Sequence, residues 1–195
     1  MKEIDFEFCQ WYNLIMEIKL LNENEIDNIK KLYKNIRENT FTLWEENYPS
    51  EELIKWDIER NGLYGVFEND KLIAISFAGE RCEDGEENFS WKENFNKRGT
   101  FARIGVSPEY QNKGIGTLLV GFILKELEKQ GFDGVRILVE IQNKNAIKLY
   151  SKFGFENCGT TERFDHKYYL LELRLAWVRQ LKFVNSSNRS FMEKI

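Results

Sequence analysis

The stretch "SPEYQNKGIGTLLV", residues 107–120, decides the fold, because it joins an apolar, strand-like run to a segment with helical periodicity. Gly114 and Gly116 allow a tight turn with no Cβ in the way, which leaves backbone amides at the start of a helix. Such amides, together with the helix dipole, attract an anion. A P-loop, and with it a nucleotide-phosphate binder, is disfavoured, because the P-loop lysine follows the second glycine, whereas Lys113 precedes both glycines here. The stretch predicts an anion-binding turn, with an ordinary glycine-rich turn as the alternative.

A second motif, "NKNAIKLYSKFGF" at residues 143–155, begins about 25 residues after the glycine turn. Its apolar residues recur at the i, i+3, i+4 and i+7 positions that share one face of a helix: Ala146, Leu149, Tyr150 and Phe153. The preceding segment, 135–141, is apolar and rich in β-branched residues, as expected of a central strand. Each motif thus opens a helix directly after a strand.

The same periodicity arguments predict the remaining elements. Strands are expected at 16–21, 63–67, 72–78, 100–106, 135–141 and 168–175, with one more near 155–160. Helices are expected after the cap-like "NENE" at 22–25, from Ser50 to about Asn61, from 116 to 130 and from 144 to 154. This order predicts a mixed α/β (α+β) domain in which helices lie on both sides of a sheet.

The charge balance of the 195-residue chain argues against a general nucleic-acid binder. Lys and Arg number 28 against 32 Asp and Glu, which gives a net charge of −4. The longest apolar run, residues 115–124, is too short to span a bilayer, and the acidic N-terminus lacks the basic region of a secretory signal. We therefore expect a cytoplasmic protein without a membrane segment.

The cysteines and the single histidine do not form a metal-binding pattern. Cys9, Cys82 and Cys158 are odd in number and lie far apart, so we expect neither a disulfide framework nor a CxxC site. His166 is the only histidine, and a structural zinc site needs four ligands. The prediction is a protein with reduced thiols and no bound metal.

The two motifs, in this order and at this distance, resemble those of the GNAT superfamily of N-acetyltransferases. "QNKGIG" (111–116) resembles the pyrophosphate loop of that family, and "NKNAIKLYSKFGF" resembles its following motif. The preceding "RIGVSPEY" (103–110) is similar to the family's fourth strand. The motifs cover residues 101–155, and the predicted element order extends the resemblance to about 16–175.

This resemblance implies one acetyltransferase domain at 16–175, between an N-terminal extension at 1–15 and a C-terminal tail at 176–195. The sheet would be mostly antiparallel with one splayed pair of parallel strands, and acetyl-CoA would lie in the gap. Separated strands leave backbone groups unpaired, and the pantetheine arm would pair with them like an added strand. The implied cofactor-binding residues are Ile104, Val106, Gln111, Asn112, Lys113, Gly114, Gly116, Thr117 and Asn143. Asn143 would contact the cofactor arm, cap its helix, or do both.

The resemblance also implies a catalytic role for Tyr150. In the family an amine attacks the thioester directly, and a tyrosine at this position often protonates the departing thiolate. A phenol with a pKa of about 10 is protonated at neutral pH and can donate its proton. The alternative is a core tyrosine on the apolar face of its helix. The backbone N–H near Val106 would meet the negative charge that develops on the carbonyl oxygen.

No general base is evident in the sequence. The strand at 100–106 contains no glutamate, and Leu138 stands where some relatives carry an acid. Glu80 and Glu140 are the remaining candidates, acting directly or through water. The base therefore stays unassigned.

The sequence thus predicts an acetyl-CoA-dependent N-acetyltransferase that works through a ternary complex. The acceptor would be a small molecule or a peptide with a primary amine, bound near the aromatic and acidic segments 40–49 and 81–91. A non-catalytic CoA-sensing or partner-binding module on the same fold is the alternative, because the strand glutamate is missing. A homodimer is left open.

Overall fold

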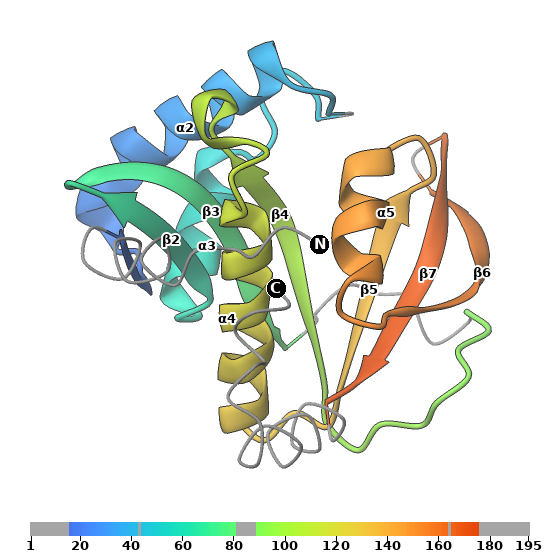
Figure 1. The fold of residues 1–195 in the computed structure, drawn as a ribbon. Coiled ribbons are helices and arrows are strands. Elements are labelled where there is room, and N and C mark those ends of the chain that lie inside the picture. The colour runs from blue at the N-terminus through green and yellow to red at the C-terminus, as the bar shows by residue number, and fades with distance from the viewer. Residues whose placement is uncertain (1–15, 43, 81–88, 164, 176–195) are drawn as a thin grey trace, which may run out of the picture.

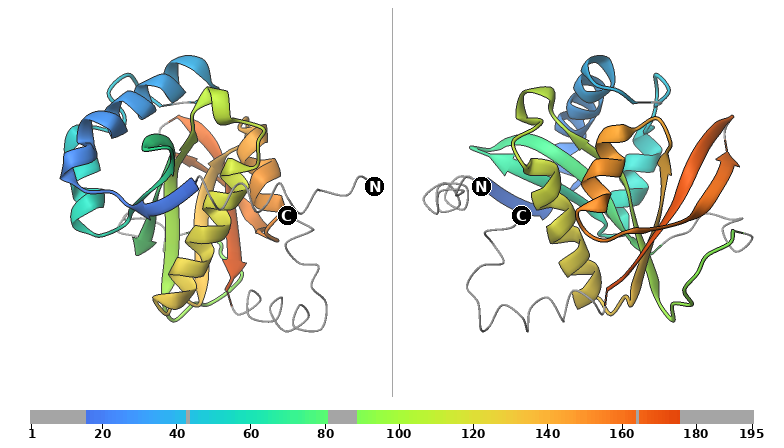
Figure 2. Two further views of the ribbon diagram at one scale, coloured as in Figure 1. Left: turned by 60° about the vertical axis from the view of Figure 1, so that its left-hand side comes forward. Right: turned by 45° about the vertical axis from the view of Figure 1, so that its right-hand side comes forward.

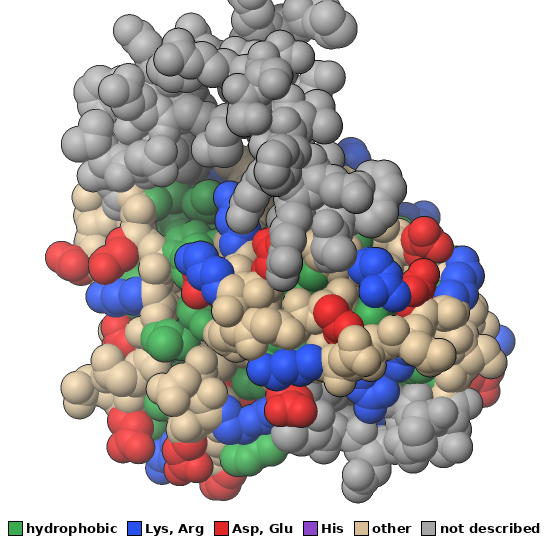
Figure 3. All heavy atoms as spheres, turned by 90° about the horizontal axis from the view of Figure 1, so that it is seen from below, with side chains coloured by type: hydrophobic (Ala, Val, Ile, Leu, Met, Phe, Trp, Pro, Cys, Tyr) green, Lys and Arg blue, Asp and Glu red, His purple; other side chains and the backbone are tan. Residues whose placement is uncertain are grey.

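The computed structural model of the chain describes residues 16–42, 44–80, 89–163 and 165–175. The predicted extension at 1–15 and tail at 176–195 lie outside the described residues. A twisted sheet with helices on both of its faces makes up the described part (Figures 1 and 2). Acidic and basic side chains intermingle over the face seen in Figure 3, in keeping with the small net charge.

The elements follow the predicted order. The strands are β1 (Met16–Leu20), β2 (Leu63–Glu68), β3 (Lys71–Glu80), β4 (Arg98–Val106), β5 (Gly134–Glu140), β6 (Glu156–Arg163) and β7 (His166–Arg174). The helices are α2 (Ile26–Asn39), α3 (Glu51–Glu59), α4 (Ile115–Lys129) and α5 (Lys144–Ser151), with short 3-10 turns η1 (Glu23–Glu25) and η2 (Pro108–Tyr110). β6 is longer than predicted, because it pairs with β7 as a hairpin up to Arg163.

The sheet opens between β4 and β5. Its strand order is β1-β2-β3-β4-β5-β7-β6, and β4 and β5 are the parallel neighbours. They are in register only at Arg98–Gly134 and Gly99–Val135, and beyond these residues they diverge (Figure 1). The other neighbouring strands are antiparallel. The predicted fold, a mostly antiparallel sheet with one splayed parallel pair, is confirmed.

Both faces of the central strands are covered by helices. On one face, Leu119, Ile123 and Leu127 of α4 pack into the core and are almost fully buried. On the other face, Ile29 of α2 and Ile54 of α3 do the same. Strands that are covered on both faces are apolar along most of their length, as β3 is. The helices packed on both faces of the sheet support β4 and β5 on either side of the opening.

The predicted caps lie at the start of η1, which leads into α2, and at the start of α3. Asn22 and Glu25 form a capping box, in which Asn22 Oδ1 accepts from Asn24 N at 2.9 Å and Glu25 Oε2 accepts from Asn22 N at 3.1 Å. Ser50 Oγ accepts from Leu53 N at 3.2 Å and caps α3. The connection between α2 and α3 lies at the rim of the opening between β4 and β5.

Candidate active site

A large cleft passes through the opening between β4 and β5. Its volume is about 1140 Å³, and it is lined by the facing edges of the two strands, the start of α4 and one side of α5. The connection between α2 and α3 and the start of β7 line its other end. A cleft of this size can hold a large cofactor and part of a second substrate.

The glycine turn opens α4 into this cleft. Asn112 and Gly114 have left-handed backbone conformations, with φ of 60° and 83°. The first helical hydrogen bond runs from Leu118 N to Gly114 O at 2.9 Å, so the amides of residues 115–117 have no acceptor within the helix. A Cβ on Gly116 would lie 3.3 Å from Leu149 Cδ2, in the space between α4 and α5. The turn therefore presents amides to a space that a side chain would fill.

The end of β4 presents the backbone of Val106 to the cleft. Ser107 N donates to Ile73 O of β3 at 2.8 Å. Because backbone groups alternate in direction along an antiparallel pair, the N–H and C=O of Val106 point away from β3. The Val106 carbonyl accepts from Gln111 Nε2 at 3.2 Å, which ties the glycine turn to the strand. The carbonyl of Val106 is thus already bonded, and its N–H is the backbone group of this residue that is left to face the opening.

A bulge in β4 lies beside the cleft and is held by a buried ion pair. Arg103 has a φ of 54°, and the β3–β4 register shifts at this point. Its guanidinium binds Asp57 of α3 through two hydrogen bonds of 2.9 and 2.7 Å, and both side chains are buried. Tyr33 donates its hydroxyl to the Arg103 carbonyl at 3.3 Å. Burial raises the pKa of Asp57, against the lowering effect of Arg103.

Tyr150 lies on the side of α5 that lines the cleft. Its ring packs against Phe101 and Phe155, with centroid distances of 5.4 and 5.9 Å, and the residue is 5% exposed. Burial raises the pKa of its phenol. Among the described residues, none forms a hydrogen bond with the Tyr150 hydroxyl. The ring is thus a core residue, while the hydroxyl is left with a proton to donate.

Asn143 caps α5, which is one of the two roles predicted for this residue. Its Oδ1 accepts from Ala146 N at 3.0 Å. Asn143 also lines the cleft, and its side-chain NH₂ group can still donate. The cap uses only the side-chain oxygen, so the NH₂ group stays available for the second predicted role, contact with a cofactor.

The structure places two candidate bases at the cleft. Glu140 lies at the end of β5, is 8% exposed and accepts from Gln142 N at 2.6 Å. Leu138 lies two residues earlier on the same face of the strand. Glu80 lines the cleft from the end of β3. His166, the chain's one histidine, also lines it, although the sequence analysis gave this residue no role.

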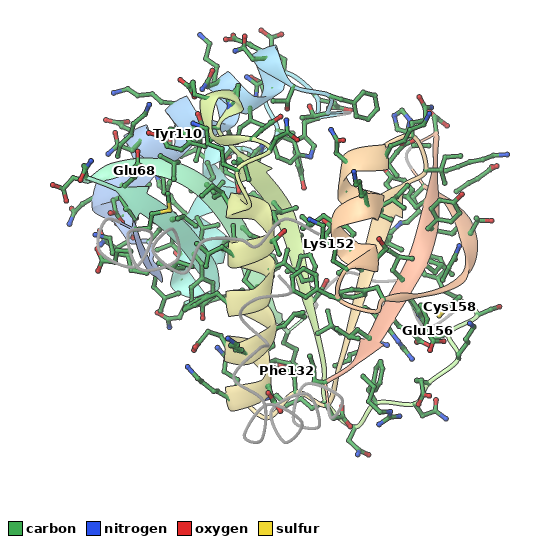
Figure 4. The ribbon with its side chains drawn as sticks, in the orientation of Figure 1. Glu68, Tyr110, Phe132, Lys152, Glu156 and Cys158 are labelled. Atoms are coloured by element: carbon green, nitrogen blue, oxygen red, sulfur yellow. The ribbon has the colours of Figure 1, made fainter. Side chains whose placement is uncertain are left out.

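Two predicted features lie away from the cleft. Lys113 does not line it, and its ammonium lies 5.1 Å from the ring centroid of Tyr110, whose hydroxyl donates to Glu68 at 2.6 Å (Figure 4). The described part of the loop before β4, residues 89–97, packs on the β5–β7 pair instead. There the amides of Lys92 and Glu93 donate to Glu172 Oε1 at 3.2 and 3.1 Å.

The position of residues 89–97 has a physical reason. The carboxylate of Glu172 and the guanidinium of Arg136 are buried on the outer face of β5 and β7, and they need polar partners there. Trp91 lies 4.7 Å from the Arg136 guanidinium and covers it. Residues 81–88, the acidic part of the predicted acceptor region, lie outside the described residues.

The remaining predicted site residues are brought together. Those that line the cleft are Ile104, Val106, Gln111, Asn112, Gly114, Gly116, Thr117, Asn143 and Tyr150. The predicted acceptor segment 40–49 contributes Trp44, Glu45 and Tyr48. Sequence reasoning missed the pair of Arg103 and Asp57, although an aspartate between Ile54 and Ile58 on the buried side of α3 is a signal for it.

Metal ligands and membrane spans were sought in the same part of the chain. Within the described ranges, no three His, Cys, Asp or Glu side chains gather in a way that could hold a metal ion. None of the described helices combines the length and apolar character that crossing a membrane requires.

The chain is similar in sequence to known proteins. A model of the acetyltransferase (GNAT) family matches residues 29–155. An uncharacterised N-acetyltransferase of Methanocaldococcus jannaschii is 28% identical over 164 residues, which cover 78% of this chain and 69% of that protein. The probable N-acetyltransferase san of Drosophila melanogaster is 40% identical over 62 residues, 31% of this chain and 34% of that protein. The chain thus spans about a third of the length of this second relative.

Solved structures share the fold. A GNAT-family acetyltransferase of Streptococcus agalactiae superposes with a TM-score of 0.70 at 20% identity, over 82% of this chain and 95% of that one. The PaiA N-acetyltransferase of Thermoplasma acidophilum, solved in complex with coenzyme A, gives 0.64 at 21% identity, over 82% and 98%. These similarities extend well beyond the two motifs, since they cover 82% of this chain.

Proposed function

This chain belongs to the acetyltransferase (GNAT) family, and from that premise we propose that it is an enzyme that transfers the acetyl group of acetyl-CoA to a primary amine. The observation that carries the proposal is the cleft between β4 and β5. It has backbone amides of α4 at one end and Tyr150 on its wall. These two features supply an anion site and a proton donor in a single cavity.

The residues present fit acetyl-CoA. The amides of residues 115–117 suit the pyrophosphate, because they lie at a helix N-terminus and Gly116 leaves space beside them. The edge of β4 at Ile104, which does not pair with β5, suits the pantetheine arm, whose amides can pair with a strand, and the N–H of Val106 is left for the thioester. The NH₂ group of Asn143, which lines the cleft, is proposed to donate to the same arm.

The reaction follows from the groups around the thioester. The Val106 amide donates to the carbonyl oxygen and stabilises the negative charge that develops there when the amine attacks. Tyr150 holds a proton on its hydroxyl and donates it to the departing sulfur. Its raised pKa keeps this proton in place at neutral pH. Both substrates are bound together, and the acetyl group passes directly between them.

The attacking amine has to lose a proton. An alkylammonium with a pKa of about 10.4 is neutral in only about one molecule in a few thousand at pH 7. Glu140 is the better placed of the two candidate carboxylates, because it lies on β5 at the edge of the opening. Its carboxylate accepts the proton through water, with Glu80 as the second candidate.

The acceptor is proposed to be a small molecule or a peptide with a primary amine. The acceptor end of the cleft is aromatic, and Phe41 and Trp56 on its rim are 50% and 43% exposed. One relative in sequence is an N-alpha-acetyltransferase 50 of zebrafish, 38% identical over 69 residues. Exposed aromatic side chains at the entrance favour an acceptor that has an apolar group beside its amine.

A panel of amines tests this function. The purified protein is incubated with acetyl-CoA and, in turn, short peptides, free lysine, a polyamine, an aminoglycoside and an aminoacyl-tRNA. Release of free thiol and the mass of the product are measured together. We expect acetylated product from at least one class. Absence of both CoA binding and thiol release would contradict the proposal.

The second candidate function is a non-catalytic CoA-binding module. Leu138 favours it, because this position of β5 carries no acid that could act as a base. In the same panel, tight binding of acetyl-CoA without turnover on any amine would support this module and exclude the enzyme.

A further inference from the structure

The bulge in β4 decides which backbone groups of that strand face the cleft. At the bulge, Ser76 of β3 lies opposite two residues of β4, Arg103 and Ile104. Because the backbone groups of a strand alternate in direction, one extra residue reverses the direction of all the groups that follow it. The N–H of Val106, which follows the bulge, therefore points into the opening and not toward β3.

The hydrogen bonds on either side of the bulge show this reversal. Ala78 N donates toward β2 at 2.7 Å, so the neighbouring Phe77 faces β4 and its partner Ala102 faces β3. Ser107 N also points to β3, where it donates to Ile73 O at 2.8 Å. Ala102 and Ser107 are an odd number of positions apart, and in a regular strand they would face opposite sides. A β4 without the bulge would thus direct the Val106 N–H to β3.

Arg103, the left-handed residue of the bulge, is held by two helices outside the strand. Its φ of 54° is one that residues other than glycine seldom adopt. Its guanidinium donates two hydrogen bonds, of 2.9 and 2.7 Å, to the carboxylate of Asp57 in α3. The two side chains are only 7% and 1% exposed. The Tyr33 hydroxyl of α2 donates to the Arg103 carbonyl at 3.3 Å. A buried pair with two parallel hydrogen bonds fixes the direction of the arginine side chain.

Asp57 acts on the cleft only through Arg103. Arg103 lines the cleft, whereas Asp57 does not, so its carboxylate touches neither substrate. The next turn of α3 and the residue before Asp57 contribute Arg60 and Trp56 to the cleft wall. The same helix thus lines the acceptor end of the cleft and holds the bulge of β4.

We propose that Asp57 is a positioning residue for acetyl transfer, which holds Arg103 in the bulge and so keeps the Val106 N–H aimed at the thioester carbonyl. This inference rests on the proposed function, which assigns the Val106 N–H to the charge that develops on that oxygen. A donor of this kind stabilises the transition state more than the bound substrate. Loss of Asp57 should therefore lower kcat and leave the KM of acetyl-CoA unchanged.

Steady-state kinetics on three variants of the full chain test the proposal. The variants are Asp57→Asn, the double variant Asp57→Leu, Arg103→Met, and the control Leu127→Ala. Leu127 of α4 is 1% exposed and does not line the cleft, so its truncation destabilises the core without changing the site. The kcat and the KM of acetyl-CoA are measured with an amine that the wild type acetylates, at a temperature at which circular dichroism shows each variant to be folded.

We expect Asp57→Asn to lower kcat at least about tenfold, because complete removal of such a donor costs about 10²- to 10³-fold. Leu127→Ala should lose Tm but keep its kcat within about twofold. The double variant should regain part of the Tm and keep the low kcat, because apolar side chains fill the space without fixing the bulge. If Asp57→Asn does not fold, the double variant carries the same comparison with the control.

A kcat for Asp57→Asn equal to that of Leu127→Ala would overturn the positioning role and leave the proposed function intact. Recovery of kcat together with Tm in the double variant would also overturn it, because Asp57 would then matter for stability alone. A higher KM with an unchanged kcat would have the same consequence. A wild type that acetylates no amine would instead contradict the proposed function, and the inference with it.

Discussion

Replacement of Tyr150 by phenylalanine removes one hydroxyl and keeps the ring. The contacts with Phe101 and Phe155 remain, because they involve only the ring. No described residue hydrogen-bonds the hydroxyl, so its removal leaves no partner unsatisfied. We expect the free energy of unfolding to change by less than about 1 kcal/mol, which corresponds to about 2–4 °C in Tm for a chain of this size.

The effect on the rate should be much larger. General acid catalysis typically contributes about 10²- to 10⁴-fold. The leaving group here is a thiolate, whose conjugate acid has a pKa of about 8.5, and a weakly basic leaving group needs less assistance. We therefore take the lower end and expect kcat to fall about 100-fold, or about 2.7 kcal/mol in activation free energy.

The assay measures initial rates of thiol release at saturating acetyl-CoA and acceptor, alongside the Kd of acetyl-CoA. The matched control is Tyr64→Phe, since Tyr64 is also 5% exposed and packs edge-on against Phe122, but does not line the cleft. The control should retain its kcat within about twofold. A kcat for Tyr150→Phe equal to that of this control would refute the role of Tyr150 as general acid.

Three further predictions follow from the same site. Gly116→Glu should abolish detectable acetyl-CoA binding by calorimetry, because its side chain enters the phosphate space and repels the anion; retained affinity would show that the turn is not the phosphate site. Asp57→Asn should lower the free energy of unfolding by about 3–5 kcal/mol, and so lower the Tm measured by calorimetry by roughly 10 °C, because the Arg103 guanidinium stays buried without the carboxylate of Asp57. The double variant Asp57→Leu, Arg103→Met should recover part of this loss, and no recovery would argue against the ion pair. The pKa of Tyr150 is raised, so the phenol stays protonated and kcat should not fall between about pH 7 and about pH 10; a fall in that range that disappears in Tyr150→Phe would contradict the assignment.

The fold was largely predictable because its signals are local. The glycine turn at 111–116 and the cap residues Asn22 and Ser50 act on backbone groups within a few residues of themselves. The apolar periodicity of residues 146–153 fixes which side of α5 is buried. These features do not depend on the rest of the chain, so they can be read before the fold is known.

The bulge and the charged wall of the cleft could not be predicted in the same way. The left-handed conformation of Arg103 is unusual for its residue type, and its guanidinium pairs with Asp57, which lies 46 positions earlier in the chain. Lys152 lies 35 positions from Thr117, and only the packing of α5 beside α4 brings the two together. Lys113 was included among the implied cofactor-binding residues because of its position in the chain, whereas its ammonium lies over the ring of Tyr110.

The assignment of a base fails for a related reason. Glu80 and Glu140 reach the cleft from the ends of two strands that are not neighbours in the sheet. Nothing in the local sequence distinguishes a carboxylate that faces a cleft from one that faces solvent. Variants Glu140→Gln and Glu80→Gln, compared at high pH where the amine is already neutral, separate a base from a structural carboxylate.

The central claim is that the cleft between β4 and β5 holds acetyl-CoA and passes its acetyl group directly to an amine. A single turnover tests it: the protein is mixed with one equivalent of acetyl-CoA labelled in the acetyl group, an acceptor from the panel is added, and the masses of protein and product are followed over time. We predict that the label moves to the acceptor without first appearing on the protein. Label on the protein before any product forms, or bound acetyl-CoA that never yields product, would contradict the claim.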